Sequence, residues 1–305
     1  MHMENYILQT KGLSYSYGKG ENTLSAINLQ VKKGQIYGFL GPNGSGKTTT
    51  LSLLLGLIRK QKGSIEIFGK DLEHHRLEIL SRTGSLIEAP SLYGNLTARE
   101  NLEIYRRAHK LPKERIDEVL EISGLSDTGK KTAKKFSLGM KQRLAIALAL
   151  LHKPELLILD EPTNGLDPSG ILELRILLKK LNQEEGITIL ISSHLLAEVE
   201  KMVTHIGIIV KGEMLFQGSL SELHQLRQRA SMLHIQTSDN EAALKILKDY
   251  SPSLHQDFIA VTVDDQKQAA ALNKILVSHH LDVFFLHPKS SDLEQLFMDL
   301  TTNLS

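Results

Sequence analysis

The chain has no cysteine among its 305 residues. This absence excludes disulfide bonds, thiol catalysis and zinc sites built from cysteine, and it permits a reducing compartment. Long apolar runs are also missing, because the longest candidates, Leu51–Ile58 and Ala145–Leu151, fall well short of the ~18–20 residues that span a bilayer. The first residues, MHMENYILQTKG, lack the apolar core of a signal peptide. We therefore expect a soluble protein, which can still dock on a membrane protein.

The chain also lacks an excess of one charge. It carries 36 Lys and Arg against 35 Asp and Glu, so no basic field over the whole chain favours nucleic acid as a partner. A chain of this length can bury one large core, or a main domain with a small companion. Composition therefore predicts no nucleic-acid partner and leaves the function to particular motifs.

One glycine-rich segment has the pattern of a phosphate-binding loop. Residues 41–48 read GPNGSGKT, which fits G-x-x-x-x-G-K-[ST], between a strand-like apolar run, Ile36–Leu40, and a helix-like run, Thr49–Leu57. The glycines let successive backbone N–H groups point at phosphate oxygens, and the positive end of the helix faces the anion. Lys47 is predicted to reach the outer phosphates and Thr48 to offer its hydroxyl to Mg²⁺, whereas the plainer alternative is a glycine turn before a helix. The predicted ATP-binding residues of this segment are Gly41, Asn43, Gly44, Ser45, Gly46, Lys47, Thr48 and Thr49.

Two carboxylates follow another apolar strand. Leu156–Leu159 is followed directly by Asp160 and Glu161. In an open parallel sheet, ligands gather at the carboxyl ends of the strands. Asp160 is therefore predicted to face the Mg²⁺ held by Thr48, and Glu161 to reach the water that attacks the terminal phosphate. A strand that ends in a solvated acidic turn is the alternative.

A second candidate anion site precedes that strand. Residues 136–143 read FSLGMKQR and open a helix that continues through Leu144–Leu151. Ser137 can serve as the N-cap, and Gly139 lets a phosphate approach the first turn closely. The alternative for this segment alone is an ordinary capped helix.

The fold class predicted from the whole pattern is α/β, with a mixed sheet, a helical insertion and a small α+β domain at the C-terminus. Strands are expected at Tyr6–Leu13, Ala26–Val31, Ile36–Leu40, Ile65–Phe68, Leu156–Leu159, Ile187–Ile191 and Ile206–Val210. Helices are expected at Ala98–His109, Lys113–Ser123 and Ile171–Asn182. These elements predict a nucleotide-binding domain at residues 1–222, whose helical subdomain covers about residues 71–152.

Residues 223–305 are predicted to form the small C-terminal domain, entered through a connecting helix at Leu220–Arg229. Its expected strands are Met232–Thr237, Phe258–Val263 and Leu281–Leu286, and its expected helices are Asn240–Tyr250, Gln266–His280 and Ser291–Leu300. Its six histidines are scattered over unlike elements, which favours solvated or packed side chains over a metal site. This domain carries no recognisable chemistry.

Five segments follow one another in the order and spacing of the ATP-binding-cassette (ABC) ATPases, and the chain resembles that family over about residues 4–225. The segments are GPNGSGKT, SLGMKQR, LLILDEP, Gly165–Pro168 and Ser192–His194. The resemblance implies a P-loop ABC ATPase that hydrolyses ATP with Mg²⁺. In that family two copies sandwich two nucleotides, so the resemblance also implies a homodimer in which Ser137, Gly139 and Met140 contact the ATP held by the partner copy.

The same resemblance implies roles for four further side chains. Tyr17 would stack on adenine, Glu161 would be the general base, His194 would hold the terminal phosphate, and Asp167 would couple the two sites across the dimer. Tyr15 is an alternative stacking ring, because both tyrosines precede the glycine turn. Taken alone, His194 would be an ordinary histidine at the end of a strand.

The chain departs from the usual family pattern in two segments. The signature reads SLGM where the family more often has SGGQ, but Ser137 and Gly139 preserve the cradle. Glu88 stands where most members have glutamine, and its charged oxygen is a hard ligand that Mg²⁺ favours. Glu88 is therefore a candidate metal ligand and catalytic residue beside Asp160 and Glu161. Neutral drift in a general exporter ATPase is the alternative.

The surroundings of Glu88 indicate one branch of the family. Residues 87–97 follow the pattern Ile-Glu-x-Pro-x-x-Tyr-x-Asn-Leu-Thr, which resembles the ATPases of bacitracin-type and lantibiotic-immunity exporters, and Asp292–Phe297 resembles tails common in that branch. The resemblance implies a peripheral subunit on the cytoplasmic face of the membrane, paired with a separately encoded permease.

Other classes of protein explain fewer of these motifs. Cassettes that act on nucleic acid or the ribosome usually carry two cassettes or a long coiled-coil insertion, and this chain has neither. P-loop kinases and GTPases do not explain SLGMKQR or Ser192–His194. A regulatory, sensing or general multidrug role remains the main alternative to peptide-antibiotic export.

Overall fold

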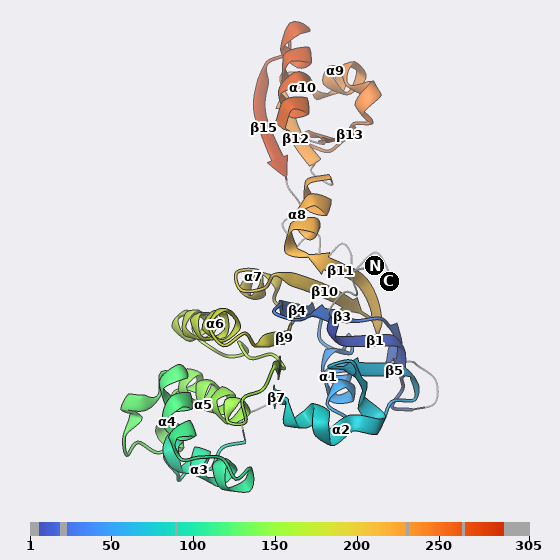
Figure 1. Ribbon diagram of the computed structural model, residues 1–305. Helices are drawn as coiled ribbons and strands as arrows, with labels where there is room; N and C mark the ends of the chain where they lie inside the picture. Colours follow the sequence, from blue (N-terminus) through green and yellow to red (C-terminus); the bar gives the residue numbers. More distant parts are fainter. Residues whose placement is uncertain (1–5, 19–22, 89–90, 230–231, 264–265, 290–305) are drawn as a thin grey trace. The chain divides into compact units, whose positions relative to one another are not determined.

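The chain folds into two compact units, Met1–Gly218 and Ser219–Ser305. The structure is a computed structural model that describes residues 6–18, 23–88, 91–229, 232–263 and 266–289 (Figure 1). The division falls just before the boundary predicted after residue 222. Some features predicted from sequence lie outside the described residues, namely positions 89–90 of the pattern around Glu88, the helix at Ser291–Leu300 and the tail Asp292–Phe297.

The large unit is built around a six-stranded sheet in the order β11-β10-β4-β9-β8-β7. Its strands are β4 (Ile36–Leu40), β7 (Thr83–Leu86), β8 (Leu156–Leu159), β9 (Thr188–Ser193), β10 (His205–Val210) and β11 (Glu213–Ser219). Strands β10, β4, β9, β8 and β7 run parallel. Every residue of β4, β8 and β9 is buried, as expected for parallel strands covered on both faces. The carboxyl ends of these three strands therefore meet at one edge of the sheet.

A second, antiparallel sheet is made by the N-terminal strands. Its order is β2-β1-β5-β6, with β3 also paired to β1. The strands are β1 (Tyr6–Tyr15), β2 (Leu24–Ile27), β3 (Gln30–Lys32), β5 (Lys62–Ile67) and β6 (Lys70–Asp71). Helix α1 (Lys47–Leu54) shares one buried core with both sheets (Figure 1). The N-terminal strands thus form a sheet of their own, whereas the sequence suggested that they join the strand before the phosphate loop.

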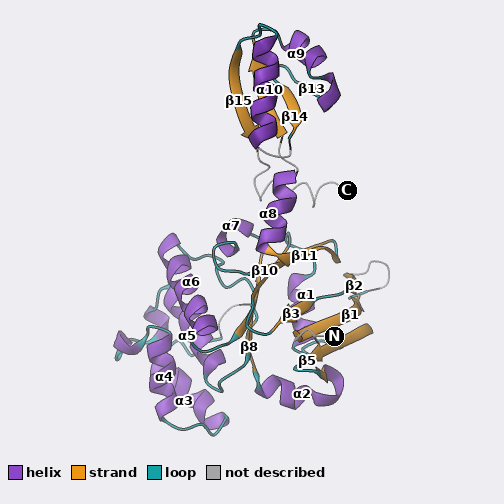
Figure 2. Cartoon of the chain, turned by 45° about the horizontal axis from the view of Figure 1, so that its top comes forward, coloured by secondary structure: helices purple, strands orange, loops and turns teal. Residues whose placement is uncertain are grey.

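Helices form the rest of the large unit (Figure 2). They are α2 (Leu72–Ser81), α3 (Ala98–Ala108), α4 (Glu114–Ile122), α5 (Leu138–Leu150), α6 (Pro168–Gln183) and α7 (Leu196–Val199), with single 3₁₀ turns at Ser126–Thr128 and Ala133–Lys135. Thr97 and Glu100 begin α3 with a reciprocal capping box.

Strand β7 lies within the range predicted to be helical, and it forms the edge of the six-stranded sheet. It has only four residues, one of them Gly84, so it has little of the apolar pattern that predicts a strand. A Cβ atom at Gly84 would lie 2.4 Å from the carbonyl oxygen of Ala149, so α5 approaches this strand as closely as backbones can. The glycine is therefore required by packing rather than by a turn.

The small unit is a four-stranded antiparallel sheet in the order β13-β14-β12-β15. Its elements are α8 (Leu220–Arg229), β12 (Met232–Thr237), α9 (Asn240–Ile246), a 3₁₀ turn at Lys248–Tyr250, β13 (Ser253–Leu254), β14 (Ile259–Thr262), α10 (Gln266–Ser278) and β15 (Val283–Lys289). Its core joins Leu233 and Ile235 of β12 to Leu272 and Leu276 of α10. Across the described residues of both units, no helix combines the length and apolar character needed to cross a membrane.

Candidate active site

The phosphate loop joins β4 to α1, and its shape requires glycine at two positions. A Cβ atom at Gly41 would lie 2.2 Å from the carbonyl oxygen of Ile209, so a side chain would clash with backbone. Gly46 precedes α1 with a φ of 103°, a left-handed value that other residues rarely adopt. The Gly41 N–H donates to the carbonyl of Ser193 at 3.2 Å, which ties the loop to β9. The backbone therefore takes the tight curve that directs N–H groups at an anion.

Lys47 and Ser45 present polar groups from inside this loop. The Lys47 side chain is only 6% exposed, and its ammonium donates to the carbonyls of Gly41 at 2.7 Å and Pro42 at 3.2 Å. The Ser45 hydroxyl oxygen is buried and has no hydrogen-bond partner among the described residues. Buried polar atoms normally have a partner. The loop thus offers a buried cation and an unused hydroxyl, and phosphate oxygens suit both.

Thr48 and Asp160 bring two hard oxygen donors together. Thr48 Oγ1 donates to Asp160 Oδ2 at 2.8 Å. Asp160 is buried at the carboxyl end of β8, and its N–H donates to the carbonyl of Leu86 in β7 at 2.8 Å. Magnesium prefers oxygen ligands and usually takes only one or two from the protein, together with substrate phosphates and water. The pair fits such a site. In the described part of the chain, no cluster of three or more His, Asp or Glu side chains could hold a metal without other ligands.

Glu161 lies between a lysine and a histidine. Its carboxylate is 3.2 Å from the Lys47 ammonium and 2.8 Å from Nδ1 of His194. Its φ of 45° is a left-handed value that few residues other than glycine adopt. Backbone strain of this kind concentrates at functional sites. The structure therefore brings Glu161, Lys47 and His194 into direct contact, with the carboxylate aimed at the phosphate loop.

Ser192 contacts both acidic residues, and the sequence reasoning assigned it no role. Its hydroxyl donates to Asp160 Oδ1 at 2.5 Å and accepts the N–H of Glu161 at 2.8 Å. The available signal was a small polar residue near the end of an apolar strand, within the segment Ser192–His194 that resembles the family. That signal acquires meaning only from the pairing of β9 with β8.

Of the two candidate stacking rings, Tyr17 is the exposed one. Its side chain is 67% exposed, whereas Tyr15 packs against the hydrophobic core. The two rings meet edge to face with centroids 4.9 Å apart. The Tyr17 hydroxyl lies 3.4 Å from Oγ1 of Thr49, directly after the phosphate loop. This geometry favours Tyr17 as the ring that would meet a base, and the stacking role itself stays a prediction.

The first turn of α5 is open to contact. Ser137 is exposed, and its hydroxyl accepts the N–H of Met140 at 3.2 Å as the predicted N-cap. A Cβ atom at Gly139 would have no neighbour closer than 3.7 Å, so the glycine leaves free space above the helix start. Among the described residues, no hydrogen bond or ion pair joins this turn to the phosphate loop of the same chain.

Asp167 begins α6 next to that turn. Its carboxylate accepts the N–H of Gly170 at 3.1 Å, so within one chain it acts as a helix cap. The Cα atom of Gly170 is the atom that a Cβ at Gly139 would meet first, at 3.7 Å. Asp167 and the start of α5 therefore belong to one surface, and a role for Asp167 across a dimer stays a prediction.

Glu88 lies two residues beyond Leu86, the last residue of β7, at the edge of the same sheet. It is exposed and has a φ of 60°, a second left-handed residue near the site. Leu86, two residues earlier, accepts the N–H of Asp160. The hydrogen bonds and ion pairs of the described residues do not include the Glu88 carboxylate. The structure therefore brings the end of β7, two residues before Glu88, to Asp160 but does not join the Glu88 side chain to Thr48 or Asp160.

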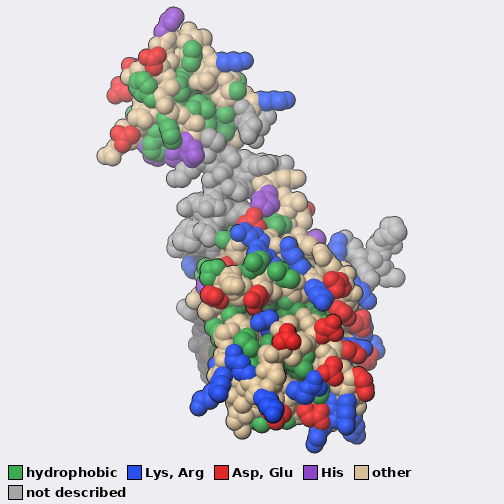
Figure 3. Space-filling view, turned by 90° about the vertical axis from the view of Figure 1, so that its left-hand side faces the viewer, with side chains coloured by type: hydrophobic (Ala, Val, Ile, Leu, Met, Phe, Trp, Pro, Cys, Tyr) green, Lys and Arg blue, Asp and Glu red, His purple; other side chains and the backbone are tan. Residues whose placement is uncertain are grey.

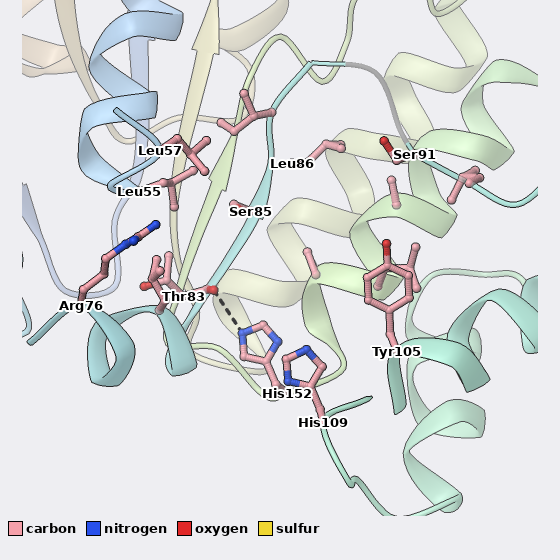
Figure 4. Close-up of a pocket in the computed structure, with 16 residues that line it drawn as sticks. Leu55, Leu57, Arg76, Thr83, Ser85, Leu86, Ser91, Tyr105, His109 and His152 are labelled. Atoms are coloured by element: carbon pink, nitrogen blue, oxygen red, sulfur yellow. Dashed lines mark hydrogen bonds between the residues drawn. The ribbon is translucent and has the colours of Figure 1, made fainter. Parts of the chain in front are cut away.

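A cavity of about 430 Å³ is lined by residues of β7 and of the helical subdomain (Figure 4). Its walls carry Leu55 and Leu57 after α1, Tyr105 of α3, and two stacked imidazoles, His109 and His152, with ring centroids 5.7 Å apart. Nε2 of His152 lies 3.1 Å from the carbonyl oxygen of Thr83. Burial lowers the pKa of His152, which favours a neutral ring there. Because Ile87 also lines it, the cavity adjoins the segment that carries Glu88.

Comparison with known proteins supplies independent information. A family model described as "ABC transporter" matches residues 24–164. The chain is 47% identical over 301 residues to the bacitracin transport ATP-binding protein BcrA of Bacillus licheniformis, covering 96% of this chain and 97% of that protein. It is 43% identical over 211 residues to the lantibiotic transport ATP-binding protein SrtF of Streptococcus pyogenes, covering 69% of this chain and 90% of that protein.

A solved structure with a similar fold is a dimer. The ATP-binding cassette MJ0796, solved as a dimer in a post-hydrolysis state with ADP and Pi, superposes with a TM-score of 0.62 and 26% sequence identity. The match covers 70% of this chain and 98% of that one.

Proposed function

The chain belongs to the ABC transporter family, and we propose that its ATPase activity powers a separately encoded membrane permease that exports peptide antibiotics of the bacitracin or lantibiotic type. One observation carries the enzymatic part of this proposal. Hydrogen bonds and ion pairs join side chains from three segments into one site. They are Lys47 and Thr48 at the start of α1, Asp160 and Glu161 after β8, and His194 after β9. None of the single sequence motifs, taken alone, predicts that these side chains meet.

The proposed chemistry is phosphoryl transfer from ATP to water. Lys47 would hold the outer phosphates, and His194 would fix the terminal one from the opposite side. The Glu161 carboxylate would accept a proton as the water oxygen bonds to the terminal phosphorus and the bond to the bridging oxygen breaks, which releases ADP and phosphate. Such reactions depend on positioning and charge stabilisation more than on covalent chemistry, which is what these side chains supply.

Magnesium would be held by Thr48 and Asp160, whose oxygens already lie within hydrogen-bond distance of each other. When bound with the nucleotide, the ion supplies positive charge that neutralises phosphate oxygens. Glu88 is a proposed further ligand, supported by its position two residues after Leu86, whose carbonyl accepts the N–H of Asp160.

A second copy of the chain is proposed to complete each site. Ser137, Gly139 and Met140 begin a helix whose N–H groups can cradle an anion, yet this turn makes no contact with its own phosphate loop among the described residues. ATP bound at residues 41–48 would therefore be covered by α5 of the partner. The dimeric state of the related cassette MJ0796 supports this arrangement.

The permease is proposed to dock at the cavity between β7 and the helical subdomain. The cavity is largely lined by apolar side chains and adjoins the segment that carries Glu88, so an occupant could act on the site through that segment (Figure 4). The protein would then be peripheral on the cytoplasmic face of the membrane. Full-length similarity to the bacitracin transport protein supports the substrate class.

A nucleic-acid partner is not part of the proposal. On the face shown in Figure 3, Lys and Arg side chains are interspersed with Asp and Glu over the large unit. A surface that binds the phosphate backbone instead gathers basic residues in one stripe or patch. The balanced charge of the chain agrees with this view.

Co-expression tests the transport role. The chain is produced together with a candidate permease sought among the neighbours of its gene, and ATP hydrolysis is measured in the purified complex with and without bacitracin. We expect the complex to hydrolyse ATP several-fold faster with the peptide, because substrate binding in the permease promotes closure of the two copies. A rate that responds to neither permease nor peptide would favour a regulatory cassette instead.

Glu88→Gln tests the branch-specific residue. The change keeps the size of the side chain and one acceptor oxygen but replaces a charged ligand by a neutral one. We expect ATP affinity within about twofold of wild type and a several-fold rise in the Mg²⁺ concentration that gives half-maximal hydrolysis. Glu66→Gln, a matched change in β5, is the control. Wild-type Mg²⁺ dependence and transport would show that Glu88 only marks a subfamily.

A further inference from the structure

Ser192 occupies the junction between the two acidic residues of the site. It is fully buried in β9, one residue beyond Ile191, which pairs in register with Leu159, the last residue of β8. The chain of β8 continues from Leu159 into Asp160. Ser192 therefore lies beside the point where the buried strand ends and the acidic pair begins.

The hydroxyl of Ser192 makes one hydrogen bond to each of the two acidic residues. A serine has one hydrogen to donate, and here it points at Oδ1 of Asp160, 2.5 Å away. The N–H of Glu161 donates to the same oxygen at 2.8 Å. Because a carboxylate only accepts and an N–H only donates, the direction of both hydrogen bonds is fixed.

These two bonds act on different features of the site. Asp160 uses its other oxygen, Oδ2, to accept from Thr48, so Ser192 holds the carboxylate in the plane that serves the proposed metal site. Glu161 has the disfavoured φ of 45°, and the direction of its side chain depends on that backbone angle. The bond to its N–H opposes relaxation to an ordinary conformation, which would turn the carboxylate away from Lys47 and His194.

We propose that Ser192 is a positioning residue for hydrolysis, which orients the Asp160 carboxylate toward the metal and holds Glu161 in its strained, productive conformation. The proposal rests on the roles proposed above for Asp160 and Glu161. It assigns Ser192 no contact with ATP, so its loss should reduce turnover more than nucleotide binding.

Ser192→Ala is the direct test, with Ser192→Thr as the conservative variant that keeps a hydroxyl. Thr188→Val is the matched control, because Thr188 is equally buried in β9 and its hydroxyl accepts the N–H of Gly34 at 2.9 Å, remote from the acids. We expect kcat to fall about 10- to 100-fold in Ser192→Ala with KM for ATP changed by less than about threefold, and half-saturating Mg²⁺ to rise several-fold. Ser192→Thr should recover most of kcat, and Thr188→Val should keep it.

Several results would overturn the inference. One is a kcat for folded Ser192→Ala within about twofold of wild type. Another is an equal fall of kcat in Thr188→Val, which would indicate a general effect of losing a buried hydroxyl. Should Ser192→Thr not fold, the double variant Ser192→Ala/Glu161→Gln decides. At saturating Mg²⁺, where the effect through Asp160 no longer limits the rate, its residual rate should lie within about threefold of Glu161→Gln alone, and a further loss of about tenfold there would contradict the role of Ser192 in holding Glu161.

The same measurements separate this inference from the proposed function. Wild-type turnover in Glu161→Gln would overturn the role of Glu161 itself, and with it the positioning role of Ser192. Turnover that is lost in Glu161→Gln but retained in Ser192→Ala would overturn only the latter.

Discussion

Glu161→Gln is expected to lower the rate of ATP hydrolysis by about two to four orders of magnitude while ATP still binds. The amide cannot accept the proton of the attacking water, but it keeps the shape of the side chain and can still bond His194. It also removes a negative charge 3.2 Å from the Lys47 ammonium. The phosphates of ATP then no longer compete with a carboxylate for that cation, so affinity for ATP should rise.

The same variant should accumulate as an ATP-bound dimer, because closure precedes hydrolysis and the step that reopens the dimer is blocked. Phosphate release gives the rate, and size-exclusion chromatography with and without ATP gives the oligomeric state. Glu185→Gln, the same change at an exposed position, is the control and should behave as wild type. Turnover at the wild-type rate in Glu161→Gln would refute the general-base assignment.

The family and the fold class could be predicted from sequence because short motifs carry them. The resemblance to ABC ATPases of the bacitracin and lantibiotic branch is confirmed, as are the α/β fold and the ATPase class. The phosphate loop could be predicted because its motif lies within eight consecutive residues, although the contact that excludes a side chain at Gly41 comes from the distant Ile209.

Features that depend on pairing between distant segments could not be predicted in this way. Strand β7 is defined by its register with β8 and by contact of Gly84 with α5, and neither is visible in four residues. The role of Ser192 needs its side chain to meet Asp160, which is 32 positions away. The left-handed backbone of Glu161 and Glu88 also has no signature in residue type, because glutamate has no particular preference for positive φ.

Two variant chains that are each inactive should restore ATP hydrolysis when they are co-expressed and form mixed dimers. Lys47→Ala removes the buried cation of the phosphate loop, so ATP loses its main charge contact. Gly139→Asp places a carboxylate where the structure leaves free space, at the start of α5. The substitution should not disturb folding, because this glycine has no positive φ and an acid in the first helical turn is favourable. It should instead repel the phosphates of ATP held by the partner copy.

The combination discriminates between a site within one chain and a site shared by two. If each site used its own chain only, neither variant could supply an intact one, and a mixture would stay inactive. If α5 of one copy covers the loop of the other, a mixed dimer joins the intact loop of Gly139→Asp to the intact helix of Lys47→Ala. Random mixing makes about half of the dimers mixed, each with one intact site, so about a quarter of the sites are restored. Phosphate release by the co-expressed variants should therefore recover toward about a quarter of the wild-type rate, whereas each variant alone should have a rate near zero. Ser126→Asp is the control for an added charge on the same subdomain.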